Sequence, residues 1–304
     1  MVAPLGDYES WKDTCDTLHA HAQGVGKLCV ALAPPEPQLQ HAALRLTARG
    51  LETNALPAPD GSGALVAGLD LHAHEAFAEH SGGRSERLPL TPDRPVGEVT
   101  RELVSAASRL AGAVEINPTP QEVDWTVPLD EDTEHATYDE AAVASYFDAA
   151  TRAALVLAEY RAPYRGRSTP VNAWWGSFDL AVNLFEGDPA DPPSDDFIMR
   201  NSMNAKDVTV GWWPGDARIP KPAFYSYAHP APDNFAETRL QPDAAYWNAD
   251  MGLFLLDWAD VLASDDPHAT ALAFARSSFM HACAVCGWDP VLASSGTGDP
   301  PPVA

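Results

Sequence analysis

The sequence predicts an α+β fold in which antiparallel sheets are covered by helices. Helical patterns and strand-like runs alternate in blocks, and turn-rich stretches separate the strand-like runs. The chain is also 45% hydrophobic, which is typical of a globular protein. Because the order helix, strands, helix occurs twice, we expect an internal duplication with two similar α+β halves, 1–130 and 131–304, packed as one globular unit.

The first half begins with an amphipathic pattern over residues 8–25, which predicts a helix. Strands are expected at 41–50 and 63–74, separated by the turn-rich stretch LPAPDGSG, and two shorter strands at 75–90. Residues 91–113 are expected to form the closing helix, because prolines and acidic residues mark its start.

The second half repeats this order, beginning with the clearest helical pattern of the chain at 138–162. Strand-like runs follow at 168–185, 207–214 and 222–230, and a last helix is expected at about 266–286.

Two expectations concern how the halves correspond and where the chain is mobile. If the halves are duplicates, the strand at 41–49 corresponds to the strand at 172–181. The long loop at 186–196 is the best candidate for a lid.

The charge balance excludes two classes of partner. The chain has 19 basic and 43 acidic residues, a net charge of -24, whereas nucleic acids and anionic membranes require basic surfaces. We find no signal-peptide pattern in the sequence and expect no apolar run of transmembrane length. We therefore expect a soluble cytoplasmic protein.

Two motifs contain residue types that bind metals, but each is incomplete. Cys283 and Cys286 form one CxxC on an expected helix, and no second pair stands at ligand spacing. His72 and His74 lie two residues apart on an expected strand, without a second histidine motif. We therefore expect no bound metal and no cofactor.

The stretch LDEDTEHATYD concentrates acidic residues just before the helix at 138–162. Glu134 and His135 are candidates for acid/base catalysis, with the glutamate raising the pKa of the histidine by its charge. The alternative is a solvated helix start, where acidic residues interact favourably with the helix dipole.

The stretch PVNAWWGSFDLAV, Pro170 to Val182, is the most unusual run of the chain. Read as one strand, its two-residue period places Asn172 and Trp174 on one face, and Trp175 and Asp179 on the other. We expect the first pair to face a ligand cavity and the second pair to be structural.

Aromatic residues on two further strands complete the expected pocket wall. Trp212 belongs to VGWWPG, and Tyr225, Tyr227 and His229 alternate along AFYSYAHP. With Asn172, Trp174 and His41, these side chains would bind a small molecule, and His229 is also a catalytic candidate. The alternative is a tryptophan-rich core between a sheet and its helices.

The motifs LTARGLET, RLPL, LDEDTEHATYD, TPVNAWWGSFDLAV, GWWPG and PAFYSYAHP occur in this order. Together they resemble the bacterial domain-of-unknown-function family numbered 5996, which implies no established activity. Members of that family usually have histidine where Asn172 stands, a His-Glu pair at Ala205 and Lys206, and an acid at Leu253. The first-half strand there begins with an Asn-His-aromatic run, where this chain reads PQLQHAAL. The resemblance thus implies a site that has lost polar groups and kept aromatic walls.

These observations favour a cofactor-independent enzyme, a cyclase or isomerase that acts on an apolar, polyketide-like or terpenoid-like metabolite of natural-product biosynthesis. No dinucleotide-binding fingerprint, P-loop, GxSxG or HExxH occurs in the sequence. Two alternatives stay open: a metal-dependent enzyme that uses His72, His74, His135 or His229, and a non-catalytic small-molecule binding protein.

Overall fold

The computed structural model describes residues 2–295 and divides the chain into two compact units. The first unit contains the residues up to Glu36, together with Gln40–Ala149 and Asn172–Asp179. The second unit contains Pro37–Leu39, Ala150–Val171 and the chain from Leu180 onward. Residues 131–149 and 172–179, which the sequence assigns to the second half, thus belong to the first unit.

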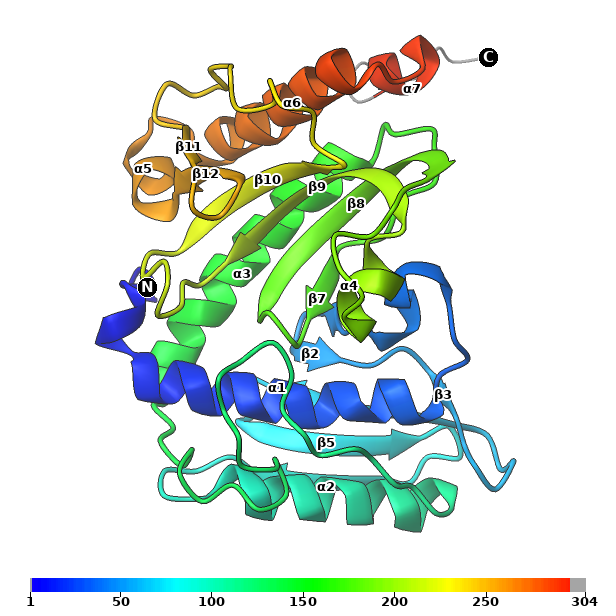
Figure 1. Cartoon of the computed structure of the whole chain (residues 1–304). Coiled ribbons are helices and arrows are strands. Elements are labelled where there is room, and N and C mark those ends of the chain that lie inside the picture. The colour runs from blue at the N-terminus through cyan, green and yellow to red at the C-terminus, as the bar shows by residue number, and fades with distance from the viewer. Residues whose placement is uncertain (1, 296–304) are drawn as a thin grey trace. The chain divides into compact units, whose positions relative to one another are not determined.

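The first unit has an antiparallel sheet in the order β1-β2-β4-β5-β6, with β3 paired to β4. Two helices, α1 (Lys12–Leu32) and α2 (Val96–Ala111), contact each other and both contact β4, so they cover the same face of the sheet (Figure 1). The strands are β1 (Arg45–Leu46), β2 (Gly50–Glu52), β3 (Leu56–Pro57), β4 (Ala64–Asp70), β5 (Glu75–His80) and β6 (Ser85–Pro89), and short 3-10 helices occupy Tyr8–Ser10 and Pro37–Ala42.

Helix α1 is buried along most of its length, including a polar stripe at helical spacing. His19 Nε2 lies 2.9 Å from the carbonyl oxygen of Trp175, Gln23 pairs with the main chain of Gln121, and Lys27 Nζ donates to the side chain of Gln121 at 3.0 Å. Each of these buried polar groups has a partner, so the stripe fixes the loop around Gln121 instead of destabilising the core.

The second unit contains a sheet in the order β11-β12-β10-β9-β8. Helix α6 contacts β9, β10 and β12, and its Phe279 ring packs edge-on against Tyr160 of α3 with centroids 6.3 Å apart. The strands are β8 (Asp179–Pro189), β9 (Ala205–Trp213), β10 (Ala223–His229), β11 (Tyr246–Asn248) and β12 (Leu253–Asp257), and the helices are α4 (Phe197–Ser202), α5 (Trp258–Ala263), α6 (Pro267–Cys286) and α7 (Pro290–Ser295). Helix α3 (Glu140–Arg161) belongs to this unit from Ala150 onward, and its first residues belong to the first unit.

The predicted α+β class with antiparallel sheets and covering helices is confirmed, whereas the expected strand correspondence is wrong in detail. His41 lies in a 3-10 helix, and the strand expected at 172–181 is interrupted by a turn at Trp175–Phe178 that separates β7 (Asn172–Trp174) from β8. Neither segment is a continuous strand, so the proposed duplication has only the recurring order helix, sheet, helix in its favour.

Helix α3 is, among the described residues, long and apolar enough to cross a membrane by length and composition. Half of its most apolar stretch is buried within the protein, as is usual for the core helix of a globular protein. The expectation that no apolar run reaches this length is therefore wrong for α3.

A glycine of α1 provides a test of the packing in the first unit. A Cβ atom added at Gly26 would lie 2.1 Å from the Trp175 ring. Alanine normally stabilises a helix relative to glycine, but here overpacking should outweigh propensity, so we expect Gly26→Ala to lower stability by about 1–3 kcal/mol. Urea or thermal denaturation measures the change.

Gly24→Ala is the matched control in the same helix, because its Cβ would meet only the Thr100 side chain, at 3.2 Å. We expect a much smaller effect there. Equal stability changes for the two variants would contradict the assigned contact between Gly26 and Trp175.

Candidate functional site

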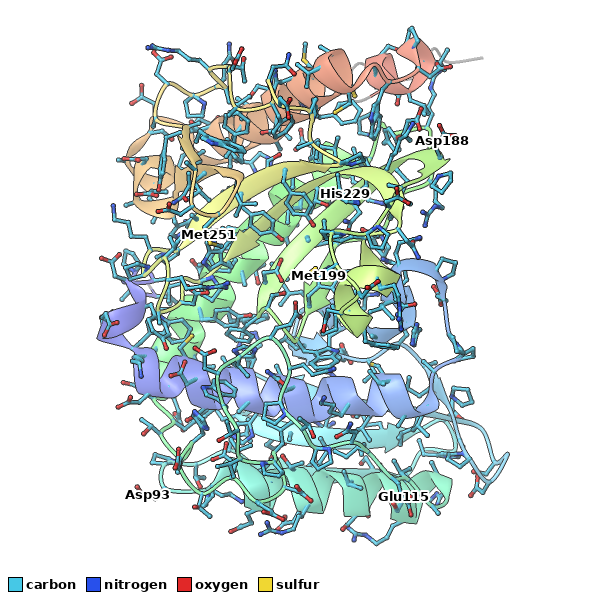
Figure 2. The ribbon with its side chains drawn as sticks, viewed as in Figure 1. Asp93, Glu115, Asp188, Met199, His229 and Met251 are labelled. Atoms are coloured by element: carbon cyan, nitrogen blue, oxygen red, sulfur yellow. The ribbon has the colours of Figure 1, made fainter. Side chains whose placement is uncertain are left out.

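The second unit's sheet has one polar and one apolar face, and cross-strand pairing determines which side chains share each face. Asp207 of β9 stands opposite Phe185 of β8 and His229 of β10. One step along the sheet, Thr209 stands opposite Asn183 and Tyr227. Because side chains alternate along a strand, we define the polar sheet face by the residues Asn183, Asp207, Thr209, Tyr225, Tyr227 and His229. His229 marks the end of β10 in Figure 2.

Asp207 is the buried acid of this face, with 4% of its surface exposed. Its Oδ2 accepts hydrogen bonds from Asn183 Nδ2 at 2.8 Å and from Thr209 Oγ1 at 2.7 Å. Asn183 Nδ2 also donates to Thr209 Oγ1 at 2.6 Å, which fixes both donors. Within the described chain, the other oxygen of Asp207, Oδ1, accepts no hydrogen bond.

Burial raises the pKa of Asp207 above the ordinary value for an aspartate. The hydrogen bonds from Asn183 and Thr209 and the charges of His229 and Arg167 act in the opposite direction, but they do not cancel the effect of burial. A buried carboxyl group with a raised pKa and one oxygen without a hydrogen bond is suited to exchange a proton.

Tyrosine and tryptophan rings continue the polar sheet face away from Asp207. The rings of Tyr225 and Tyr227 stack with centroids 6.3 Å apart, and the Trp213 ring lies 5.1 Å from Tyr225. Gly211 stands opposite Tyr225 and leaves room for its ring, since a Cβ atom there would lie 2.3 Å from the ring. These rings form an apolar wall next to the polar groups.

Trp212 does not belong to this wall, contrary to the expected grouping with Tyr225 and Tyr227. It stands opposite Phe224, so its side chain emerges from the other face of the sheet. There it is fully buried and packs edge-on against Trp258, with centroids 5.9 Å apart. The neighbouring Trp213 takes the place beside Tyr225, because the register of β9 against β10 turns that residue toward the tyrosines.

Arg167 and His229 lie at opposite ends of the row that contains Asp207. The Arg167 guanidinium lies 3.5 Å over the ring of Phe185, the residue opposite Asp207. His229, opposite Asp207 on the other side, donates from Nε2 to the carbonyl oxygen of Asp191 at 3.1 Å. The buried acid is therefore flanked by two basic side chains.

The stretch PVNAWWGSFDLAV is a hairpin rather than the single strand that its alternation predicts. Residues 175–178 form a turn, and Phe178 adopts a positive φ of 56°. The expected separation of Trp174 from Asp179 is therefore wrong, because both residues line one small cavity in the first unit. That cavity measures about 10 Å³, room for about one water molecule.

The remaining residues of this hairpin have structural partners in the first unit. Trp175 Nε1 donates to the carbonyl oxygen of Ala42 at 2.8 Å. Asn172 is fully buried, accepts a hydrogen bond from Arg45 and donates to Gln40 at 2.8 Å. His41 follows Gln40 directly, and its Nδ1 accepts from the amide of Glu36 at 3.0 Å. The structure thus brings Asn172 and the segment with His41 together.

His135 has a carboxylate partner, but this partner is Asp132 rather than Glu134. His135 Nδ1 lies 2.6 Å from Asp132 Oδ2, and the Trp125 ring lies 4.4 Å from the imidazole. Burial lowers the pKa of His135, but the hydrogen bond and charge of Asp132 outweigh this and raise it. Glu134 is exposed and contributes least among the neighbouring acids.

The segment around His135 also has a structural role. The amide of Val96 donates to the His135 carbonyl oxygen at 2.9 Å, and the amide of Gly97 donates to that of Asp132 at 2.8 Å. These bonds satisfy amides in the first turn of α2, which lack partners within the helix. The acidic stretch therefore stabilises the start of α2 rather than α3 alone.

The two sequence motifs with metal-binding residue types do not form clusters. His72 and His74 lie in the turn between β4 and β5, not on a strand face, and His74 Nδ1 lies 3.1 Å from the Tyr138 hydroxyl. Cys283 and Cys286 are free thiols on α6. Across residues 2–295, no group of three potential ligands is close enough to hold a metal ion.

The expected site residues thus fall into two groups. His41, Glu134, His135, Asn172 and Trp174 belong to the first unit, and Trp212, Tyr225, Tyr227 and His229 belong to the second. Sequence reasoning missed Asp207, Asn183 and Thr209, although the run DVTV already places Asp207 and Thr209 on one face of a strand and two valines on the other.

The pairing of His135 with Asp132 predicts how its pKa responds to substitution. We expect Asp132→Asn to lower the pKa of His135, because the neutral amide no longer stabilises the imidazolium. Glu134→Gln, the matched control, should change it far less. Histidine NMR titration measures both, and a larger shift in Glu134→Gln would restore Glu134 as the partner.

Comparisons with known proteins agree with the resemblance of the motifs. A family model described as a family of unknown function, DUF5996, matches residues 4–294, nearly the whole chain. Comparison with curated proteins and with solved structures found no significant match. The chain therefore belongs to the family of unknown function DUF5996.

Proposed function

We propose that the polar sheet face of the second unit is the proton-transfer site of a cofactor-independent enzyme. The enzyme would isomerise or cyclise a small, largely apolar metabolite, such as a polyketide-like or terpenoid-like natural product. One observation carries the proposal: Asp207 is buried, has a raised pKa, and leaves Oδ1 without a hydrogen bond among the described residues.

Each part of the face has a role in such a reaction. Asn183 and Thr209 hold Oδ2 of Asp207 and so orient Oδ1, which would remove a proton from a carbon next to a carbonyl group and return it elsewhere. The raised pKa makes the carboxylate a stronger base than an exposed aspartate. The stacked rings of Tyr225 and Tyr227 would hold the apolar body of the substrate against the sheet.

Proton transfer of this kind can be detected without the natural substrate. In deuterium oxide, an active-site base exchanges the acidic C–H hydrogens of a bound ketone, and proton NMR follows the loss of signal. We expect the protein to accelerate exchange in 2-cyclohexenone or 2-tetralone above the buffer rate. Asp207→Asn should reduce the enzymatic rate by about 100-fold or more, since it removes the general base.

Asp257→Asn is the control on the same face, because Asp257 is already paired with Lys221 Nζ at 2.9 Å and Tyr246 Oη at 3.0 Å. It should retain the activity. Binding of these ketones without exchange would contradict catalysis and favour the non-catalytic binding protein. Exchange that persists in Asp207→Asn would remove Asp207 from the mechanism.

A further inference from the structure

Arg167 is held in place by an aromatic ring and a neutral amide rather than by an ion pair. Its guanidinium lies 3.5 Å over the Phe185 ring, and Nη1 donates to Gln38 Oε1 at 2.7 Å. Gln38 in turn donates from Nε2 to Asn204 Oδ1 at 2.6 Å. No acidic side chain of residues 2–295 forms an ion pair with Arg167, although the chain has 43 acidic and only 19 basic residues.

Arginines of this acidic protein fall into two groups: some pair with carboxylates, and others, such as Arg84 and Arg161, donate to uncharged groups. Arg49, Arg87 and Arg94 each form an ion pair with at least one glutamate. An arginine that is fixed by stacking and by a neutral amide keeps its charge and most of its N–H groups for another anion. Nε and Nη2 of Arg167 donate to no described residue, and together they form the edge that binds a carboxylate in a bidentate manner.

The position of Arg167 connects this edge to the candidate site. Phe185, which lies beneath the guanidinium, stands directly opposite Asp207 across β8 and β9. Side chains of such a pair emerge about 5 Å apart on the same face of a sheet. The charges of Arg167 and Asp207 also act on each other. An anion held by Arg167 would therefore lie next to the buried acid.

We propose that Arg167 binds a carboxylate group of the substrate, which makes the substrate a carboxylic acid with an apolar or aromatic body. This assignment rests on the proposed function for its link to Asp207. The carboxylate would pair with Nε and Nη2, and the apolar body would extend from the Asp207 row toward Tyr227 and Tyr225. The site would therefore discriminate between an acid and its neutral amide, rather than select for apolar character alone.

The test uses 3-phenylpropionate and its neutral amide, 3-phenylpropionamide, as probes of the full chain. Calorimetric or NMR titration should show that the carboxylate binds and that the amide binds at least about tenfold more weakly. Arg167→Ala should weaken carboxylate binding by a similar factor. Arg167→Lys should restore part of it, since lysine supplies the charge but not the paired donors. Unchanged thermal unfolding of the variants establishes that they are folded.

Arg165→Ala is the matched control, because Arg165 lies on the same connection, is exposed, and makes no side-chain hydrogen bond to a described residue. It should bind the carboxylate as the unmodified protein does. If Arg165→Ala lost as much carboxylate binding as Arg167→Ala, the effect would come from general positive charge, and the assignment to Arg167 would be overturned. Equal binding of acid and amide, or no binding of the acid at millimolar concentration, would overturn it as well.

Asp207→Asn separates this assignment from the proposed function. Because the variant removes a negative charge near Arg167, it should bind 3-phenylpropionate as tightly as the unmodified protein, or more tightly. If proton exchange proves independent of Asp207 while Arg167→Ala still loses the carboxylate, the proposed function fails and the carboxylate site stands. If Asp207→Asn loses proton exchange while Arg167→Ala binds 3-phenylpropionate normally, the proposed function stands and the carboxylate site fails.

Discussion

Cross-strand register between β8, β9 and β10 decides which side chains can act together in the second unit. Side chains alternate between the two faces of a strand, so Val208 and Val210 share the face of Trp212 and Phe254, whose rings contact α5 and α6. Asp207 and Thr209 emerge from the other face. A shift by one residue would turn the carboxylate into the apolar layer and the valines onto the polar face. The apolar face is specified by its packing against helices such as α6, and the polar face follows from it.

The buried carboxyl group imposes a second constraint on the same strands. Removing an aspartate from water is unfavourable unless hydrogen bonds replace the lost hydration. Asn183 and Thr209 supply such bonds to one oxygen only, so burial still raises the pKa of Asp207. A raised pKa, with one oxygen left without a hydrogen bond from the described residues, is the physical basis for assigning this aspartate a chemical role.

Sequence patterns could predict the class of fold and part of the polar face. Periodicity distinguishes helices from strands, and the alternation in AFYSYAHP correctly places Tyr225, Tyr227 and His229 on one face. Register between strands is not encoded in a single strand, so the local pattern groups Trp212 with the tyrosines, whereas the structure places Trp213 beside them. Asp132 reaches the imidazole of His135 through a local turn, and charge alone does not distinguish it from Glu134 in the sequence.

The hairpin at Trp175–Phe178 shows a different limit. Its residues alternate as in a strand, and Gly176 and Ser177 are the only local signs of a turn. Phe178 adopts a positive φ, which is unfavourable for a bulky residue and depends on tertiary contacts. His19 supplies one of them, since its ring stacks on Phe178 at 4.8 Å, and its Nε2 donates to the Trp175 carbonyl oxygen. Such contacts between distant segments are not visible in a local pattern.

The pKa of Asp207 in the folded protein tests the central claim most directly. Carbon-13 NMR of the labelled carboxyl group, assigned by its loss in Asp207→Asn, should show titration above the ordinary value of 3.8. Because a raised folded pKa favours the protonated form, the unmodified protein should also lose stability relative to Asp207→Asn as the pH rises through that range. Titration at or below 3.8, with no such change in relative stability, would contradict the account.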